Sequence, residues 1–240
     1  MGGRILLIAT VLYIVGVSNA SLAPFIKPCK PSDSDCAVAN ANNAIPLFAA
    51  GLPELKVGTL DPINFDKVDS STPNLKFIMT DITVQGLKGC KMMKIERDET
   101  TSKMQLRLEC SVKLDGQYEL TGNILILTVS GNGKVHTELN EAVFDLNCDV
   151  VTKTGTDGKD HWHVTRFRHT FDLPKKSVVV FEDLFEGNEV LGQAADNLIK
   201  TSGSEIVKEI GGPMIQAAMT SVVKAINNFF SIVPVEQLTQ

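Results

Sequence analysis

The chain has 240 residues, of which 43% are hydrophobic and 21% are charged, and its formal net charge at pH 7 is -5. This size and apolar content suffice for one large domain, or two small ones, and argue against global disorder. The acidic balance, without a run of Lys and Arg, excludes electrostatic attraction to nucleic acid or to an anionic membrane as the basis of function.

The first twenty residues are organised as a secretory signal peptide. Arg4 supplies a basic start, residues 5–17 form an apolar run, and Ser18-Asn19-Ala20 offers small residues for cleavage. The run is shorter than the roughly 20 apolar residues that a membrane span needs, and a single-span anchor is the alternative. We therefore expect a secreted protein that begins near Ser21 and is not stably inserted in a membrane.

All five cysteines follow this leader. Cys29 and Cys36 flank a polar stretch, and secretion would expose them to an oxidising environment, so a local disulfide is predicted. The alternative is a metal site, which would need further Cys or His ligands close by. Among Cys90, Cys110 and Cys148 at most one more pair can form, which leaves at least one buried free thiol or intermolecular link.

The first predicted element is a helix that starts at Cys36, directly after the acidic run Asp33-Ser34-Asp35. Asp35 is the expected cap, and Gly51 is a good stop residue. Pro46 predicts a kink inside this helix. An extended connector rich in proline follows it.

The clearest predicted strand runs from Lys103 to Leu114, where apolar and polar residues alternate. A period of two over this length indicates a half-buried strand. One apolar and one solvated face are typical of an antiparallel sheet. The apolar positions are Met104, Leu106, Leu108, Cys110, Val112 and Leu114.

Further strands and turns continue this pattern. Ser130-Gly131-Asn132-Gly133 and Thr156-Asp157-Gly158-Lys159 are predicted hairpin turns, because their residues tolerate positive φ. The strands predicted around them are Ile124–Val129, Lys134–Leu139, Phe144–Val150 and Trp162–Leu173.

The length of the central strand region constrains its shape. Residues 103–129 would extend over about 90 Å, whereas a compact domain of this size has a diameter of about 45 Å. Glycines inside a strand pattern mark bends, so the chain is expected to bend hard or reverse near Gly116 and Gly122. A strongly curved sheet follows from this expectation.

The C-terminal third changes to a helical period. Residues 188–200 and 205–210 are predicted helices, and Gly211-Gly212-Pro213 interrupts them. Residues 214–233 form a predicted amphipathic helix of about 30 Å. Its apolar face is so wide that the helix must be largely enclosed, and the curved sheet is the obvious enclosure.

Several segments, in their order and spacing, resemble the insect takeout family, which is related to juvenile-hormone-binding proteins. The resemblance covers essentially the whole mature chain. The segments are the Cys29–Cys36 loop, Gly51-Leu52-Pro53-Glu54-Leu55, Leu60-Asp61-Pro62, Gly86-Leu87-Lys88-Gly89, Gly122-Asn123-Ile124-Leu125-Ile126-Leu127, Gly131-Asn132-Gly133 and Asp183-Leu184-Phe185-Glu186-Gly187-Asn188.

This resemblance implies an α+β fold in which a highly curved antiparallel sheet wraps a long C-terminal helix around an internal apolar tunnel. It implies one ligand-binding domain over residues 21–240 and pairs Cys29 with Cys36. Family members bind long-chain or terpenoid-like ligands, and several are linked to feeding, circadian output or chemosensory signalling. Juvenile-hormone carriers share a second disulfide to the C-terminal helix, which is excluded here because no Cys follows Cys148. The takeout branch is therefore favoured.

The candidate ligand-binding residues are apolar strand and helix positions together with one tyrosine. Tyr118 is on the same alternation as Leu114, and its hydroxyl could anchor an ester, epoxide or carbonyl, although a half-exposed strand tyrosine is the plainer interpretation. Core packing is likewise the plainer role for the apolar positions. The full set is Phe77, Met79, Met104, Leu106, Leu108, Leu114, Tyr118, Phe144, Leu146, Met219, Val222 and Ile226.

Three histidines lie close together in the sequence. His161 and His163 share a strand face and could hold a metal ion with Asp157 or Asp160. Their place beside a predicted turn favours solvent-exposed loop histidines instead, so no metal site is predicted. His169 is expected to be partly buried.

Enzyme motifs are absent from the sequence: there is no Gly-x-Ser-x-Gly elbow, phosphate loop, dinucleotide fingerprint or His-Glu-x-x-His. A novel Ser-His-Asp esterase is a weaker alternative. A nucleophilic Cys110 or Cys148 is weaker still, since apolar burial raises the pKa of a thiol. An extracellular signalling protein with an exposed apolar patch is a further alternative.

The sequence thus favours a secreted, monomeric, non-enzymatic carrier with no cofactor and no nucleic-acid partner. Its expected ligand is a small, elongated hydrophobic molecule, such as a terpenoid, a juvenile-hormone-like compound or a fatty lipid.

Overall fold

The computed structural model describes residues 21–185, 195 and 197–240, and the predicted signal peptide lies outside them. A seven-stranded antiparallel sheet dominates the molecule. Five strands follow the order β1-β2-β4-β5-β6, while β3 pairs with β4 and β7 pairs with β5. The strands are β1 (Ile63–Asp69), β2 (Leu75–Gln85), β3 (Lys91–Asp98), β4 (Lys103–Ile124), β5 (Leu127–Thr154), β6 (Asp160–Asp172) and β7 (Val178–Phe181).

The central hairpin of β4 and β5 is longer than the sequence indicated. Its strands have 22 and 28 residues, and the chain reverses at Leu125 and Ile126 rather than at Ser130–Gly133 as predicted. Leu125 has a positive φ of 52°, and the side chain of Ile126 is 88% exposed. The prediction of a turn at residues 130–133 was therefore wrong, because those residues lie inside β5 and pair with β4.

Close packing explains the glycines that suggested this turn. A Cβ on Gly133 would lie 2.6 Å from the carbonyl oxygen of Glu182, and one on Gly131 would lie 3.0 Å from that of Asp183. Glycine in a strand permits another backbone to approach this closely. These glycines therefore serve the docking of residues 182–184 and not a turn.

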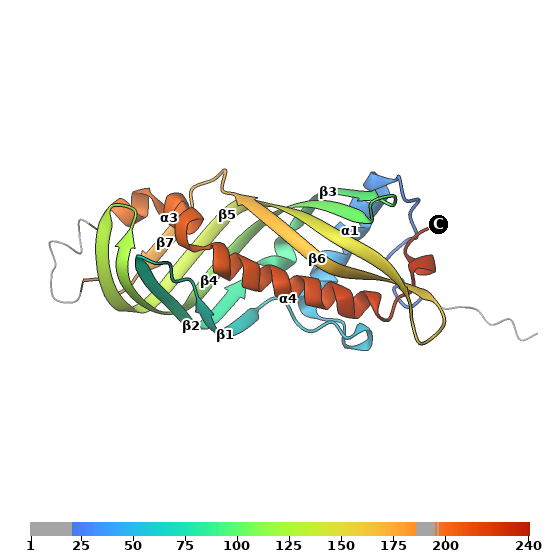
Figure 1. Cartoon of the computed structure of the whole chain (residues 1–240), viewed down its shortest axis with the longest axis horizontal. Coiled ribbons are helices and arrows are strands. Elements are labelled where there is room, and N and C mark those ends of the chain that lie inside the picture. The colour runs from blue at the N-terminus through green and yellow to red at the C-terminus, as the bar shows by residue number, and fades with distance from the viewer. Residues whose placement is uncertain (1–20, 186–194, 196) are drawn as a thin grey trace, which may run out of the picture.

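The expected reversal near Gly116 and Gly122 is also wrong, because β4 continues through both residues. The size estimate assumed a spherical domain, whereas the molecule is elongated and the two long strands run along it (Figure 1). The alternative, a bend near Gly116, agrees with a break in the β2–β4 register, because Thr80 pairs with Gln117 and Thr83 pairs with Asp115, on either side of Gly116. Such a bulge locally bends and twists a strand.

The turn predicted at residues 156–159 is confirmed, since it joins β5 to β6. The curved antiparallel sheet and the long C-terminal helix are confirmed as well. The described helices are α1 (Ser34–Ala50), α3 (Gly203–Ile210) and α4 (Gly212–Phe230), with short 3₁₀ turns at Pro53–Leu55, Leu87–Gly89 and Val235–Gln237.

The ends of the helices follow their local sequence, with one correction. The cap of α1 is Asp33 and not Asp35, because the Asp33 carboxylate accepts a hydrogen bond from the Cys36 amide at 3.0 Å. Gly51 ends α1 with a φ of 91°. Ala195 and residues 197–200 are helical, and the remainder of the helix predicted at 188–200 lies outside the described residues.

Helix α4 lies lengthwise against the sheet and contacts both β1 and β6, the two ends of the five-strand order (Figure 1). Asn227 fastens it to β6 with two hydrogen bonds. Its Oδ1 accepts from the Val164 amide at 2.8 Å, and its Nδ2 donates to the Val164 carbonyl at 2.9 Å. The helix thereby satisfies a backbone position on the edge of β6 that pairs with no other described strand.

Candidate functional site

The apolar surfaces of the sheet and the helices leave a cavity of about 660 Å³ between them. Strands β2, β3, β4, β5, β6 and β7 form one wall, and α1, α3 and α4 form the other. Alternation places every second strand residue on the inner face of the sheet. The cavity is thus a direct result of the strand pattern and of helices that do not fill the concave face.

Eleven of the twelve candidate ligand-binding residues line this cavity. Phe77, Met79, Phe144, Leu146 and Met219 are buried, and the other six are half-buried. The alternation of β4 and the helical spacing of α4 bring them to the same space. The eleven are Phe77, Met79, Met104, Leu106, Leu108, Leu114, Phe144, Leu146, Met219, Val222 and Ile226. Contact of these residues with a ligand remains a prediction.

Tyr118 is the exception, because it is not among the residues that line the cavity. It is buried with 3% of its surface exposed, and its hydroxyl donates a hydrogen bond to the Glu182 carbonyl at 2.7 Å. Its ring meets that of Phe181 edge-on with centroids 4.9 Å apart. Neither interpretation of Tyr118, as an anchor for the ligand or as a half-exposed strand residue, agrees with the structure. Its side chain instead fixes the segment after β7 to the sheet.

Helix α1 contributes a wall that the sequence analysis did not assign. Ala37, Ala41, Ala44, Ile45 and Phe48 all line the cavity. Their spacing of three and four residues was a signal for an inward helical face. The small alanines obscured it, since they add little to an apolar stripe, yet they let the helix approach the cavity closely.

The exposed residues among those lining the cavity mark its opening. They are Lys30, Pro31, Ser32, Asp33 and Glu96, and all of them lie at the N-terminal end of α1 or near the end of β3. Ser34 joins these two elements, because its hydroxyl donates to the Ile95 carbonyl. The remaining lining residues are buried or half-buried, so the cavity reaches solvent at this end.

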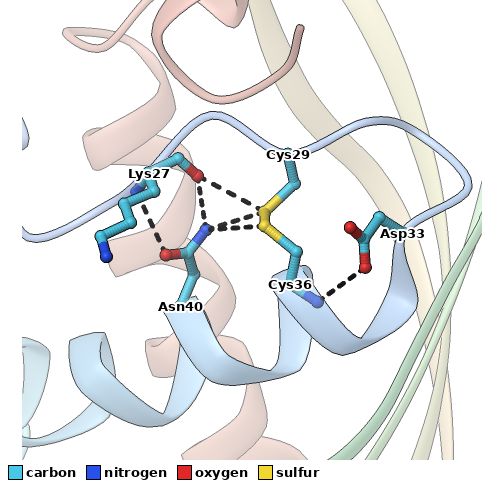
Figure 2. The surroundings of a disulfide bond; sticks show 5 residues. All are labelled: Lys27, Cys29, Asp33, Cys36 and Asn40. Carbon is cyan, nitrogen blue, oxygen red and sulfur yellow. Dashed lines mark hydrogen bonds between the residues drawn. A yellow bond between two sulfur atoms is a disulfide. The ribbon is translucent and has the colours of Figure 1, made fainter.

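A disulfide between Cys29 and Cys36 holds the loop at the opening (Figure 2). Asn40, one turn after Cys36 in α1, braces the loop. Its Nδ2 donates to the Lys27 carbonyl at 2.6 Å and approaches the Cys29 sulfur at 3.0 Å, while its Oδ1 accepts from the Lys27 amide at 3.1 Å. The bridge and the asparagine together fix the chain that borders the opening.

The C-terminal residues of the chain meet this loop. The Cys29 amide donates to the Leu238 carbonyl at 3.1 Å, and the Gln240 amide donates to the Cys29 carbonyl at 3.0 Å. Leu238 and Thr239 also line the cavity. The opening is therefore framed by segments from both ends of the described sequence.

The other three cysteines, Cys90, Cys110 and Cys148, all line the cavity. Cys90 and Cys110 form a second disulfide between the start of β3 and β4, and Cys148 is a buried free thiol. This agrees with the prediction that these three cysteines form at most one further disulfide and leave at least one thiol. Burial raises the pKa of the Cys148 thiol to about 11, so it remains protonated and poorly nucleophilic at neutral pH.

Arg97 and Trp162 bring further polar groups to the cavity wall. Both line the cavity, and the Arg97 guanidinium carbon lies 4.0 Å from the centre of the Trp162 ring. Burial lowers the pKa of Arg97, although a guanidinium stays charged at physiological pH. Sequence reasoning missed this pair. Its signals were the only Trp of the chain and an Arg two positions after Ile95, on the inward alternation of β3.

Curvature is what brings this pair together. Arg97 is on β3 and Trp162 is on β6, with β4 and β5 between them. Three steps of about 4.8 Å would separate these strands by about 14 Å in a flat sheet, and their side chains would point in parallel. A ring contact at 4.0 Å therefore requires the sheet to curl at this end.

The histidine predictions need two corrections. His163 lies in β6 and is half-buried, so it is not a solvent-exposed loop histidine. His161 is buried with 6% exposed, its Nδ1 lies 2.7 Å from the Phe230 carbonyl oxygen, and its Nε2 lies 3.2 Å from the Asp157 carboxylate. It therefore joins the β5–β6 turn to the end of α4 and is not a solvent-exposed histidine. His169 is half-buried, as predicted, and burial lowers its pKa. Within residues 21–185, 195 and 197–240 no three His, Cys, Asp or Glu side chains are grouped to hold a metal ion.

The helices that the structure describes include none with the length and apolar character needed to cross a bilayer.

Known proteins resemble this chain over nearly its full length. The model of the haemolymph juvenile hormone binding protein (JHBP) family matches residues 5–240. The circadian clock-controlled protein daywake of Drosophila yakuba is 22% identical over 232 residues, which cover 92% of this chain and 88% of that protein. Daywake of Drosophila melanogaster is 20% identical over 224 residues, or 88% and 86% of the two chains. The crystal structure of Epiphyas postvittana Takeout 1 superposes with a TM-score of 0.85 and 25% identity, over 90% of this chain and 100% of that one.

Proposed function

This chain belongs to the haemolymph juvenile hormone binding protein family, whose members bind hydrophobic ligands, and we propose that it is a secreted carrier of one small, elongated hydrophobic molecule. The ligand occupies the cavity between the sheet and the helices, which acts as the internal tunnel expected from the sequence. A terpenoid, a juvenile-hormone-like compound or a fatty lipid has the required shape and apolar surface. No chemical step is assigned to the protein.

The cavity is the observation that carries this proposal. Its volume of about 660 Å³ falls within the range of about 300–1,000 Å³ that is usual for small-molecule sites. Its deep walls come from the apolar faces of β4, β5 and α4. Each methylene moved from water to such walls contributes about 0.8 kcal/mol, so a chain of ten or more carbons supplies enough free energy for stable binding.

Secretion accounts for three further features of the chain. An apolar leader precedes Ser21, two disulfides are present, and the acidic composition favours solubility. An apolar ligand needs a carrier in an aqueous extracellular fluid, which gives the cavity its physiological purpose. We expect the carrier to act as a monomer.

A second candidate is an extracellular signalling or interaction protein with a role in circadian, feeding or chemosensory output. It is favoured by the similarity to two proteins named as circadian clock-controlled. The two candidates differ in what the purified protein binds. A carrier retains apolar small molecules, whereas an interaction protein captures a receptor from the tissue extract and does so equally well with its cavity filled.

The carrier proposal is tested by filling the cavity. Leu106 is half-buried on the cavity wall, and Leu106→Trp places an indole in the space of the ligand. The matched control is Ile126→Trp, at the exposed tip of the β4–β5 hairpin and outside the cavity. The measurement is titration with N-phenyl-1-naphthylamine, an apolar dye that fluoresces in a dry site.

We expect the unmodified chain and Ile126→Trp to bind one dye molecule with the same affinity. Leu106→Trp should bind at least about tenfold more weakly, since the indole removes apolar contact area worth more than about 1.4 kcal/mol. Equal binding by a folded Leu106→Trp protein would show that the dye occupies another place and would refute the proposal.

A further inference from the structure

Two buried hydrogen-bond donors of the cavity wall have no partner in the described part of the chain. They are Nε of Arg97 and Nε1 of Trp162. Trp162 is more than nine-tenths buried, with 9% of its surface exposed, and Arg97 is half-buried. Buried polar atoms are nearly always hydrogen-bonded, and an unpaired one costs about 1–3 kcal/mol. Two such donors beside one another in an apolar wall therefore call for an acceptor.

Among the described residues no carboxylate forms an ion pair with Arg97. Glu96 is paired with Lys94 at 2.8 Å, and Asp33 caps the Cys36 amide. Glu99 acts on Arg97 only through its charge, without a hydrogen bond. The guanidinium instead stacks over the Trp162 ring. This cation–π contact orients the guanidinium but uses none of its N–H donors.

The surroundings of Trp162 hold the pair in place. The Trp162 ring meets Phe230 of α4 edge-on with centroids 5.5 Å apart, and the adjacent His161 bonds the Phe230 carbonyl. Burial and these contacts fix the indole, and the indole in turn orients Arg97. The pair lies at the open end of the cavity, because Arg97 directly follows Glu96, one of the exposed residues at the opening.

We propose that Arg97 and Trp162 form a polar subsite for a carboxylate, and hence that the preferred ligands are long-chain carboxylic acids with the acid at the opening and the tail along β4 and α4. A carboxylate offers two acceptor oxygens to the guanidinium and the indole N–H together. Charge-assisted bonds of this kind are about twice as strong as neutral ones, so an acid is preferred over an ester or a hydrocarbon of equal length.

This inference rests on the carrier proposal, and the test separates the two. Palmitate, methyl palmitate and hexadecane have nearly the same tail and differ at the head. Each is used below its aggregation concentration to displace the naphthylamine dye from the unmodified chain, Arg97→Met, Trp162→Phe and Lys91→Met. Lys91 is an exposed lysine on the same strand and outside the cavity, so its variant controls for the loss of one positive charge.

We expect palmitate to bind about ten- to a hundredfold more tightly than methyl palmitate to the unmodified chain and to Lys91→Met. Arg97→Met should lose this preference while its affinity for methyl palmitate stays within about threefold. Trp162→Phe keeps an aromatic ring but lacks the N–H, and should lose about three- to tenfold of the preference. Equal binding of acid and ester, or a preference that survives Arg97→Met, overturns the subsite and leaves the carrier intact. Failure of all three probes to displace the dye overturns both.

Discussion

Helices α1 and α4 both cover the cavity, and both are fastened to a strand edge by the amide of one asparagine. Asn227 of α4 bonds the amide and the carbonyl of Val164 on β6, and Asn42 of α1 does the same to Met92 on β3, at 2.8 and 3.0 Å. The surroundings differ, because Asn42 is exposed whereas Asn227 is half-buried. The same pair of asparagine hydrogen bonds is thus exposed to solvent in α1 and partly buried in α4.

The two helices also differ in how deeply they are buried. Helix α4 buries Met214, Ile215, Met219, Val223, Ala225 and Phe229, whereas α1 buries only Ala44 and Ala49 fully. Local stability follows the amount of buried apolar contact. The difference teaches that α4 is a structural part of the core, while α1 is a thinner cover at the opening. Four measurements can break or sharpen this contrast.

The largest effect is expected at Phe229, where the two helices meet. Phe229 is 2% exposed, and its ring lies 5.1 Å from that of Phe48 on α1. Phe229→Ala should lower the free energy of unfolding by about 3–5 kcal/mol, the usual cost of truncating a core phenylalanine. Urea denaturation measures it. Phe48→Ala, at a half-buried ring on α1, is the matched variant and should cost clearly less; equal losses would remove the distinction between the two covers.

Asn227→Leu should produce the next largest effect. The leucine removes both partners of Val164 from a half-buried position, so the amide and the carbonyl are left unpaired. Each such group costs about 1–3 kcal/mol, and partial access to water reduces the sum to about 2–3 kcal/mol. The same denaturation experiment measures it. A loss below about 1 kcal/mol would show that water replaces the asparagine and that α4 is not fixed in this way.

Asn42→Leu should cost less than about 1 kcal/mol. Its partners on Met92 are at an exposed edge, where water satisfies them once the amide is gone. Hydrogen exchange of the α1 amides adds a local measurement. We expect faster exchange in α1 and unchanged exchange in α4. A global loss as large as that of Asn227→Leu would contradict the ranking.

The smallest effect is expected at His136 on the sheet, away from both helices. Hydrogen bonds to Asp115 at 2.7 Å and to Glu138 raise the pKa of His136, the first being the larger cause. Because the folded pKa is raised, the stabilisation is complete below the unfolded pKa of about 6.5 and is lost as pH rises through the folded pKa.

At this partly exposed site the effect should be only a few tenths of a kcal/mol. The measurement is the difference in unfolding free energy between the unmodified chain and His136→Gln from pH 5 to 8.5. A difference that grows with rising pH would contradict the assignment of charge in this cluster.

The periodic spacing of apolar residues and local turn and cap signals predicted much of this fold. The alternation from Met104 to Leu114 placed the inner face of β4 correctly, and the helical spacing of Met219, Val222 and Ile226 placed that of α4. The turn at Ser130–Gly133 was wrong because glycines that permit close backbone packing look the same in sequence as glycines that permit a turn. Sequence pattern does not distinguish these two uses.

For the strands of the candidate site, the sequence pattern predicted which residues face inward, but not which residues they contact. The prediction that Tyr118 contacts the ligand was wrong, because alternation gives the face of a strand on which a residue lies but not its neighbour on that face. Here that neighbour is the segment after β7. Arg97 and Trp162 were missed for a related reason. They are 65 residues apart in sequence and meet only because the sheet curls. Contacts between distant strands depend on curvature, and curvature is not encoded in a local period.

The most direct test of the cavity as a binding site is to identify what the protein retains. The chain, expressed in its secreted form and purified without detergent, is extracted with organic solvent, and the extract is analysed by mass spectrometry beside that of Leu106→Trp. We predict close to one equivalent of an elongated apolar molecule from the unmodified chain and much less from the variant. Recovery of no apolar molecule from the unmodified chain, together with no uptake of added palmitate, methyl palmitate or dye, would contradict the carrier function.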